Sequence, residues 1–316
     1  MIRWGVIGTG GIASTFAADL AHTDSGQVVA VGSRRQATAD EFASRFGAAR
    51  AYEGYEALVA DPEVDVVYVA TPHPMHHEDT LLALRAGKPA LVEKPFTMDA
   101  GEAEELVAEA RERGLFLMEA MWARFLPHIR ELRRLLAEGV VGEVVTVHAD
   151  HAQWFAEDRA FRLFAPELGG GALLDLGIYP VSFASMVLGT PDRVVALADP
   201  AFTGVDAQTS ILLGHPGGAH AVLTCTLAAR SPTRATIVGT EARIEIEGPF
   251  YASSAFVLTP RVGEPQRVEL PPAGGLRHEA DEVARCVEAE LLESPVMPLD
   301  ETVAIMRTMD QIAATA

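Results

Sequence analysis

The sequence predicts an α/β domain with a doubly wound parallel sheet, followed by an α+β domain with a large, mostly antiparallel open sheet. The chain has 316 residues, and a single hydrophobic core rarely serves more than roughly 250 to 300 residues, so we expect two domains. Strand-like and helical patterns alternate over residues 1–120, as in parallel βαβ units, whereas residues 206–270 carry one strand-like run after another. We therefore place the boundary between residues 120 and 121, with the second domain extending to residue 316.

Short β-branched runs mark the strands expected in the first domain. Between them, apolar residues recur at helical spacing, as at Ile12, Phe16 and Leu20, and another helix is expected over Met75–Ala86. These helices should pack on the sheet. The strand candidates are Arg3–Ile7, Val28–Val31, Val64–Ala70, Ala90–Val92 and Leu115–Met118.

The second domain is expected to begin with a helix over Pro127–Glu138 and a strand over Glu143–His151, and a glycine-rich segment should open a helix near Gly171. Two further helices are expected at the end of the chain, over Leu276–Glu293 and Asp300–Ala314. The strand candidates between them are Ser210–Leu213, Ala221–Leu227, Thr236–Val238, Ile244–Ile246 and Phe256–Leu258.

Composition narrows the classes of partner. The formal net charge is −19, and a field of this sign disfavours nucleic acid and anionic lipid. Cys225 and Cys286 lack the spacing of a disulfide framework or a zinc site. The N-terminus enters a strand without a charged and apolar leader, and no apolar run reaches the roughly 18 residues that span a bilayer. We expect a cytoplasmic protein with neither a nucleic-acid partner nor a membrane partner.

The first strand runs into a GxGxxA turn, Gly8 to Ala13, at the start of a helix. In this context Gly8 permits the tight turn, while Gly10 lets the backbone approach a pyrophosphate. Gly11 and Ile12 open a helix whose unpaired N–H groups can bind phosphate. The sequence therefore predicts a dinucleotide-binding Rossmann domain, and we assign Gly8, Gly10, Gly11 and Ile12 to the cofactor.

The end of the second strand indicates which dinucleotide is bound. A domain that prefers NAD places Asp or Glu there to hold the ribose 2′-hydroxyl, whereas this chain has Ser33, Arg34 and Arg35. A hydroxyl can donate to a 2′-phosphate, and a guanidinium can pair with it bidentately. We expect NADP, held by Ser33 and Arg34, with NAD as the possible alternative; Arg35 is expected to be solvated.

Two further strand ends should face the cofactor, because ligands of open α/β sheets bind at the carboxyl ends of the strands. One carries Thr71, Pro72, His73 and His76, and the other carries the triplet Glu93-Lys94-Pro95. A glycine turn, a TP-x-x-x-H segment and an EKP triplet at this spacing resemble the glucose-fructose oxidoreductase/inositol dehydrogenase (Gfo/Idh/MocA) family. The resemblance implies that Thr71, Pro72, His76, Glu93 and Lys94 line the cofactor site.

The resemblance extends through the second domain, over residues 118–125 and the run Gly169-Gly170-Gly171-Ala172-Leu173-Leu174-Asp175-Leu176-Gly177-Ile178-Tyr179. These pieces are similar to the branch that contains dimeric dihydrodiol dehydrogenases and NADP-dependent D-xylose dehydrogenases. The resemblance implies that the second domain binds substrate and forms oligomers, with a homodimer or higher homo-oligomer assembled through the C-terminal sheet. Many relatives have His where Tyr179 stands, so their proton-transfer assignment cannot be copied.

Lys94, Asp175 and Tyr179 are the predicted catalytic residues. Asp175 and Tyr179 are four residues apart at a predicted helix start and should share one face. The resemblance implies that Lys94 and Tyr179 touch the reacting oxygen, where an ammonium and a phenol can stabilise charge and move a proton. An unperturbed tyrosine titrates near 10, so its use as a base requires a nearby cation, for which Lys94 is the candidate. Asp175 would orient substrate hydroxyls or Lys94.

Other residues are assigned to the cofactor or the substrate. Trp122 is expected at both, Arg124 at the cofactor, and His73 at the substrate. Phe155 and Arg162 flank a predicted loop, together with Trp154, and are assigned to the substrate. The histidines His73, His76, His77 and His151 lie on different predicted elements without a carboxylate or Cys at ligand spacing, so no metal is expected.

The leading functional hypothesis is an NADP-dependent oxidoreductase that transfers hydride between the nicotinamide and a sugar, such as the aldose D-xylose, or a cyclic trans-dihydrodiol. Two alternatives use the same fold: a non-catalytic NAD(P)-binding regulator, and an NAD-dependent glycosidase of the same superfamily. The presence of Lys94, Asp175 and Tyr179 argues against the regulator. Arg34 and Tyr179 argue against the glycosidase.

Overall fold

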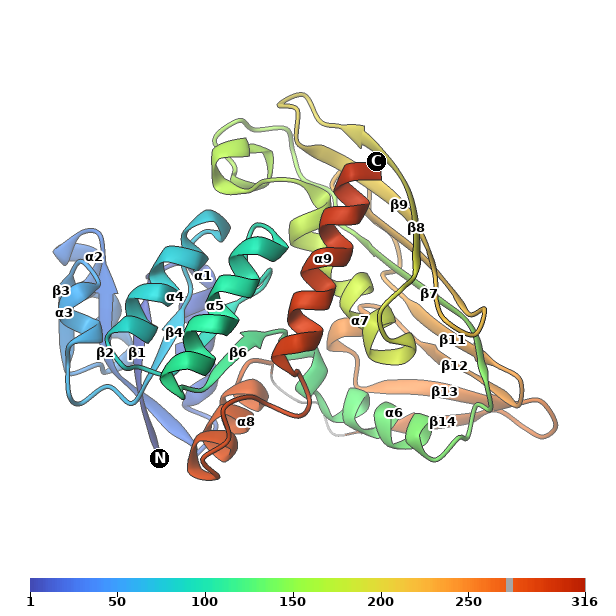
Figure 1. The fold of residues 1–316 in the computed structure, drawn as a ribbon, viewed down its shortest axis with the longest axis horizontal. Helices are drawn as coiled ribbons and strands as arrows, with labels where there is room; N and C mark the ends of the chain where they lie inside the picture. The colour runs from blue at the N-terminus through green and yellow to red at the C-terminus, as the bar shows by residue number, and fades with distance from the viewer. Residues whose placement is uncertain (271–274, 316) are drawn as a thin grey trace. The chain divides into compact units, whose positions relative to one another are not determined.

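The structure is a computed structural model that describes residues 1–270 and 275–315. The chain forms two compact units. Over the described residues, the first unit comprises 1–125 and 275–303, and the second comprises 126–270 and 304–315. The division falls within the last helix, α9 (Leu299–Thr315). Figure 1 shows the elements of both units.

The first unit contains a parallel sheet of six strands in the order β3-β2-β1-β4-β5-β6. This order, with strand three at one edge and the crossover beside β1, is that of a Rossmann domain, and it confirms the predicted fold. The expected strands are present, and β3, which was not predicted, completes the edge. The strands are β1 (Ile2–Ile7), β2 (Gly26–Ser33), β3 (Arg50–Glu53), β4 (Val66–Val69), β5 (Ala90–Glu93) and β6 (Leu117–Ala120).

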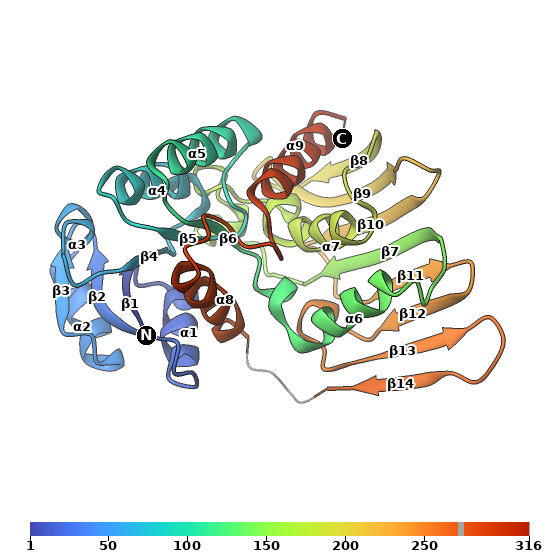
Figure 2. The same ribbon diagram turned by 60° about the horizontal axis from the view of Figure 1, so that its bottom comes forward.

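Helices cover both faces of this sheet. In Figure 2, α1, α2 and α8 lie on one face, and α4 and α5 lie on the other. Their apolar stripes supply the core, as Phe16 and Leu20 of α1 do. The helices are α1 (Gly11–Leu20), α2 (Gln36–Phe46), α3 (Glu56–Val59), α4 (His76–Arg85), α5 (Ala100–Arg113) and α8 (Arg277–Glu288), with short 3₁₀ helices at His73–Met75 and Trp122–Phe125.

The helix α8 belongs to a different unit from the one expected when the chain is divided at residue 120. Residues 275–303 were expected in the second domain, but they belong to the first unit. The backbone N–H of Leu276 donates to the Asp19 carboxylate at 2.7 Å, and the Thr23 hydroxyl donates to Asp281 at 2.5 Å. A helix far along the sequence thus completes the Rossmann core, which local patterns do not reveal.

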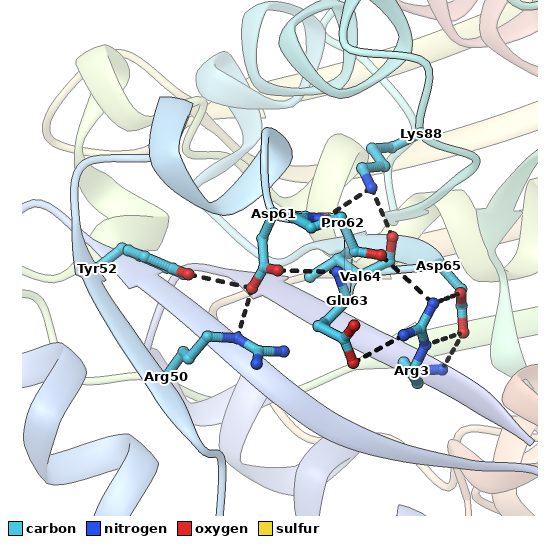
Figure 3. Close-up of polar contacts among 9 residues, drawn as sticks. All are labelled: Arg3, Arg50, Tyr52, Asp61, Pro62, Glu63, Val64, Asp65 and Lys88. Carbon is cyan, nitrogen blue, oxygen red and sulfur yellow. Dashed lines mark hydrogen bonds and ion pairs between the residues drawn. The ribbon is translucent and has the colours of Figure 1, made fainter.

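A network of charged residues fixes the amino ends of the strands (Figure 3). Arg3 of β1 pairs with Asp65, which precedes β4, through Nη2–Oδ1 at 2.6 Å and Nε–Oδ2 at 3.0 Å. The Lys88 ammonium donates to the carbonyls of Asp61 and Val64 at 2.8 and 2.7 Å. This network lies at the amino ends of the strands. The predicted cofactor residues lie at the opposite end of the sheet, where the strands have their carboxyl ends.

The second unit contains a sheet of eight strands in the order β14-β13-β12-β11-β7-β10-β9-β8 (Figure 2). All neighbouring pairs are antiparallel except β7 and β10, so the predicted mostly antiparallel sheet is confirmed. The strands β8 and β14 were not predicted. The strands are β7 (Val144–Ala152), β8 (Arg193–Pro200), β9 (Asp206–Gly214), β10 (His220–Thr226), β11 (Ala235–Gly239), β12 (Ala242–Ile246), β13 (Ala255–Pro260) and β14 (Gln266–Glu269).

Two helices, α6 (Pro127–Ala137) and α7 (Ile178–Leu188), lie on one face of this sheet (Figure 1). The helical stretch Pro166–Leu188 is long and apolar enough to cross a membrane by length and composition, which corrects the expectation that no such run exists. Of its most apolar window, 72% is buried within the structure, as in a core helix. The remaining short helices are a π-helical turn, Leu173–Gly177, and 3₁₀ helices at Arg162–Phe164, Pro166–Leu168 and Phe250–Ala252.

Candidate functional site

The glycine turn between β1 and α1 leaves its backbone open. Gly8 has φ +100°, and a Cβ there would lie 2.8 Å from the carbonyl oxygen of Ala70. Both the backbone conformation and the lack of space therefore require glycine at this position. A Cβ on Gly10 or Gly11 would meet nothing within 4 Å. No side chain caps the α1 N-terminus. The turn therefore presents unobstructed backbone N–H groups, the arrangement that binds a pyrophosphate.

At the end of β2, Arg34 and Ser33 differ in what they can offer a 2′-phosphate. Arg34 is exposed and pairs with no carboxylate among the described residues. Ser33 is buried, and its Oγ lies 2.6 Å from Thr38 Oγ1. Because the Thr38 hydroxyl donates to the Arg35 carbonyl at 2.9 Å, the Ser33 hydroxyl must donate to Thr38. In this arrangement Arg34 is available to a phosphate, but the Ser33 proton is not.

Tyr55 and Asp79 lie near Arg34, and sequence reasoning missed both. Burial raises the pKa of the Tyr55 phenol; nearby Asp79 raises it further, while Arg34 lowers it. Burial also raises the pKa of Asp79 to about 6, and its carboxylate accepts from the Thr71 hydroxyl at 2.8 Å. No sequence motif marks these two positions. Their proximity arises because the parallel strands β2, β3 and β4 end, and α4 begins, in the same region of the unit.

His76 joins the two strand ends that carry the TP-x-x-x-H and EKP segments. Its side chain is fully buried, with Nε2 2.9 Å from the Thr71 carbonyl and Nδ1 2.8 Å from the Pro95 carbonyl. Burial, and to a smaller extent the Lys94 charge, lower its pKa, while these carbonyls oppose the shift. The ring is therefore held between the Thr71 and Pro95 carbonyls, and the predicted place of His76 at the cofactor site stays a prediction.

Lys94 follows β5, and its backbone is fixed by its neighbour. The Glu93 carboxylate is buried and accepts from the Lys94 backbone N–H at 3.1 Å and from the Tyr68 hydroxyl. Tyr68 in turn stacks on Phe16 of α1, with ring centroids 4.0 Å apart. Glu93 thus points into the unit and orients the Lys94 backbone, and its predicted place at the cofactor site stays a prediction.

Two more acids lie buried near Glu93. Glu119 ends β6, and burial raises its pKa to about 7 although the Arg124 charge and the Phe96 N–H oppose the shift. Glu279 of α8 is fully buried, and neither of its carboxylate oxygens has a hydrogen-bond partner among the residues that the structure describes. Burial, followed by the charge of Glu93, raises its pKa well above the usual range. Nothing in the sequence marked this cluster, because its members come from distant elements.

Arg124 and Trp122 are placed near the same part of the first unit. Arg124 is buried, and its Nη2 lies 2.8 Å from Glu301 Oε1; its predicted place at the cofactor stays a prediction. Trp122 is half-buried, and its ring edge lies 3.4 Å from the position of a Cβ on Gly275. Its predicted contacts with cofactor and substrate stay predictions, as do those of Pro72 and Ile12.

In the second unit, Asp175 pairs with Arg162. Its Oδ1 accepts from Nη1 at 3.1 Å and from Nη2 at 3.0 Å. The expected α-helical start is wrong in detail, since Leu173–Gly177 form a π-helical turn and Tyr179 lies in α7. The four-residue spacing therefore does not place Asp175 and Tyr179 by α-helical geometry. Asp206 caps this turn by accepting from the Leu173 N–H at 2.6 Å.

Tyr179 is buried among aromatic rings. Its centroid lies 5.2 Å from that of His151 and 4.7 Å from that of Tyr251. His151 Nδ1 is 3.2 Å from the Leu176 carbonyl, and Nε2 is 3.0 Å from the Gln153 amide nitrogen. Because a carbonyl only accepts and an amide NH₂ only donates, this His carries its proton on Nδ1. The aromatic surroundings fix the Tyr179 ring, and His151 uses both nitrogens within the unit.

The remaining assignments divide between the units. Phe155 is half-buried and packs on the small core that includes Leu163 and Phe164, so its ring supports the 162–165 turn. His73 is buried beside His76, with ring centroids 5.8 Å apart. His77 lies 3.1 Å from the Glu105 carboxylate, on the outside of the first unit. Over residues 1–270 and 275–315, no group of three or more His, Cys, Asp or Glu is arranged to hold a metal.

The first unit fits a dinucleotide on its own geometry. The open Gly10 and Gly11 backbone, the uncapped α1 and the exposed Arg34 suit a pyrophosphate and a ribose phosphate. Lys94 is in this unit, whereas Asp175 and Tyr179 are in the second.

Two protein-family models match the chain. Residues 2–121 match one described as "Oxidoreductase family, NAD-binding Rossmann fold", and residues 129–245 match the "GFO/IDH/MocA C-terminal domain". Together these ranges cover most of the chain, and they meet near the change in architecture described above.

Similar proteins are dehydrogenases and reductases. The trans-1,2-dihydrobenzene-1,2-diol dehydrogenases of Bos taurus and Homo sapiens are each 37% identical to this chain, over 98% of it and 96% of the relative. A 3-ketoreductase from Actinomadura kijaniata, solved with NADP and TDP-benzene, is 30% identical with a TM-score of 0.89, over 100% of this chain and 98% of its own. An aldose-aldose oxidoreductase from Caulobacter crescentus, solved with glycerol, is 25% identical with a TM-score of 0.90, over 100% and 97%.

Proposed function

The chain belongs to the Gfo/Idh/MocA oxidoreductase family and is an NAD(P)-dependent dehydrogenase, and we propose that it prefers NADP and oxidises a cyclic trans-diol or a sugar. The observation that carries the proposal is the pairing of an open glycine turn with an exposed, unpaired Arg34 at the end of β2, where an acid would hold the ribose of NAD. The NADP complex of the 3-ketoreductase supports it.

In this proposal each catalytic side chain has one task. The glycine turn and Arg34 would hold the cofactor, whose nicotinamide would supply the hydride acceptor. The Lys94 ammonium stabilises negative charge on the reacting oxygen, and Tyr179, reacting as its phenolate, takes up the alcohol proton and becomes the neutral phenol. The Asp175 carboxylate orients substrate hydroxyls. Support for these roles comes from the fixed backbone of Lys94, the aromatic surroundings of Tyr179 and the preformed ion pair of Asp175.

The substrate class follows from the relatives. The curated relatives are named for a trans-dihydrodiol, and the Caulobacter crescentus relative is named for aldoses. Both classes present adjacent hydroxyl groups on a ring, which an ammonium, a phenol and a carboxylate can bind. We place trans-dihydrodiols first because those relatives match at the higher identity, and aldoses such as D-xylose second.

The test is reduction of NADP, followed at 340 nm, with a panel of trans-dihydrodiols, aldoses and polyols. A net rise in absorbance with at least one diol or aldose is expected. Glycoside cleavage without a net change would instead identify the NAD-dependent glycosidase, in which the cofactor is re-reduced within each turnover. If the protein binds NADP but changes neither diols, sugars nor glycosides, it is a regulator and the proposal fails.

We also propose that two copies associate through the C-terminal sheet, in the cytoplasm. Val195, Leu212 and Val222 are exposed and lie opposite one another on β8, β9 and β10, and exposed Leu197 extends this apolar row. A row of this kind on a sheet favours association. Light scattering should give the mass of a homo-oligomer for the wild type and a lower mass for Leu212→Asp; a monomeric wild type would contradict the proposal.

A further inference from the structure

Asp175 is a carboxylate almost removed from water, and Arg162 is a cationic partner of it within the same unit. Its side chain is 6% exposed, whereas that of Arg162 is 50% exposed. Burying a carboxylate is costly unless charge and hydrogen bonds compensate. Both terminal nitrogens of Arg162 donate to the same oxygen, Oδ1, at 3.1 and 3.0 Å.

The segment that carries Arg162 is built against the glycine run. A Cβ on Gly170 would lie within 2.9 Å of the carbonyl oxygens of Arg162, Leu163 and Ala165, so only glycine lets this turn approach so closely. The Gly171 N–H donates to the Leu163 carbonyl at 2.9 Å. Leu163 itself is fully buried. The backbone of Arg162 is therefore held beside the π-helical turn.

The Asp175 side of the pair is fixed independently. Gly171 has φ +125°, and a Cβ there would clash with the Asp206 carboxylate, which lies close because it caps the Leu173 N–H. Thr209 donates to the same carboxylate at 3.3 Å. The backbones of both partners are thus held in place without substrate, and the Asp175 carboxylate is buried. In these respects the pair differs from an ion pair between two exposed side chains, which contributes little.

We infer that Arg162 is a positioning residue that acts through Asp175: it sets the direction of that carboxylate toward substrate hydroxyls and does not bind the substrate itself. The inference rests on the proposed function, in which Asp175 orients the substrate. It replaces the sequence-based assignment of Arg162 to substrate contact. It also gives the run of three glycines a purpose beyond starting a helix, because Gly170 and Gly171 allow the two segments to approach.

A double-mutant cycle in kcat/KM tests this inference. Arg162→Gln should lower kcat/KM for the best diol or aldose by about tenfold or more, with the same division between KM and kcat as Asp175→Asn and with unchanged NADP affinity. The double variant should be no slower than Asp175→Asn alone, within about twofold, because the two residues act as one unit. Arg162→Lys should recover part of the loss, since it restores the charge without the planar pair of donors.

Arg159→Gln is the matched control. It lies in the same segment, with its guanidinium 5.7 Å from the Phe202 ring, and should leave kcat/KM unchanged. The inference is overturned if Arg162→Gln has the same kcat/KM as the wild type. It is also overturned if adding Arg162→Gln to Asp175→Asn lowers kcat/KM by the same factor as adding it to the wild type. The latter result would show that Arg162 touches substrate directly.

The four proteins of the cycle, which are the wild type, Arg162→Gln, Asp175→Asn and the double variant, are also compared in chemical unfolding without substrate. Arg162→Gln should lower the unfolding midpoint of the wild type but not that of Asp175→Asn. Equal shifts in both backgrounds would show that the ion pair does not exist and overturn the inference even for a protein that turns over no substrate. Coupling in unfolding without coupling in kcat/KM would overturn the positioning role. Failure of the proposed function itself appears separately, as a wild type that never reduces NADP.

Discussion

Among single side chains, Tyr179 has the most specific role in the proposed function, because the proton of the alcohol must leave as the hydride does. Tyr179→Phe keeps the ring that packs on His151 and Tyr251 but removes the hydroxyl. It should lower kcat by about a hundredfold or more, the range of a positioned acid-base group, and flatten the rise of oxidation toward alkaline pH. Measured pH profiles of kcat check this. A variant that keeps the full alkaline rise would assign the base elsewhere.

Lys94 should show a different pattern from the residues that only bind cofactor. Lys94→Met should lower kcat by at least about a hundredfold while the dissociation constant for NADP stays nearly unchanged, because the ammonium acts on charge that develops at the reacting oxygen. Lys88→Met is the control, since that ammonium donates to two carbonyls at the amino ends of the strands and is not assigned to the chemistry. Near-normal turnover in Lys94→Met would remove Lys94 from the mechanism.

Among the helices, α8 makes the sharpest prediction about stability, through Glu279. Its pKa in the folded protein is raised well above the usual 4.5 by burial and by Glu93. Below about pH 4.5 the folded and unfolded chains both hold this proton. Above it only the unfolded chain releases the proton, so the free energy of unfolding falls by up to about 1.4 kcal/mol per pH unit until the folded pKa is reached.

Glu279→Gln should therefore be more stable than the wild type at pH 8, with a smaller difference near pH 4. Between these two pH values its free energy of unfolding should fall less than that of the wild type. Denaturant unfolding at several pH values measures this. Glu288→Gln on the same helix is the control, because that carboxylate is exposed and should leave the pH dependence unchanged. A Glu279→Gln protein with the decline of the wild type would show that this carboxyl ionises at an ordinary pH.

For the molecule as a whole, local patterns predicted more of the fold than of the site. The strand, glycine turn and helix around Gly8 are adjacent in sequence, so the phosphate-binding turn could be predicted. Pairs such as Arg124 with Glu301 join residues far apart in the chain, and α8 returns to the first unit only because its buried face completes that core. Such contacts depend on tertiary packing, which a single sequence does not encode locally.

The same reason explains why the sequence did not show how several of the predicted site residues are held in place. Glu93, Arg124 and His76 lie in motifs that resemble cofactor-binding segments, yet each is buried and uses its polar atoms inside the first unit. Sequence motifs identify the segment that lies near a ligand but do not distinguish the side chain that touches the ligand from the one that holds the segment in place. Ser33 shows the same limit, because its hydroxyl donates to Thr38.

The most direct test of NADP preference is the ratio of kcat/KM for NADP to that for NAD, measured on the wild type and on Arg34→Asp with one substrate. Arg34 is the exposed cation at the end of β2, so the wild type should favour NADP, and Arg34→Asp should raise the KM for NADP far more than that for NAD. Ser33→Ala should change the ratio less. A wild type that uses NAD at least as well as NADP would contradict the account.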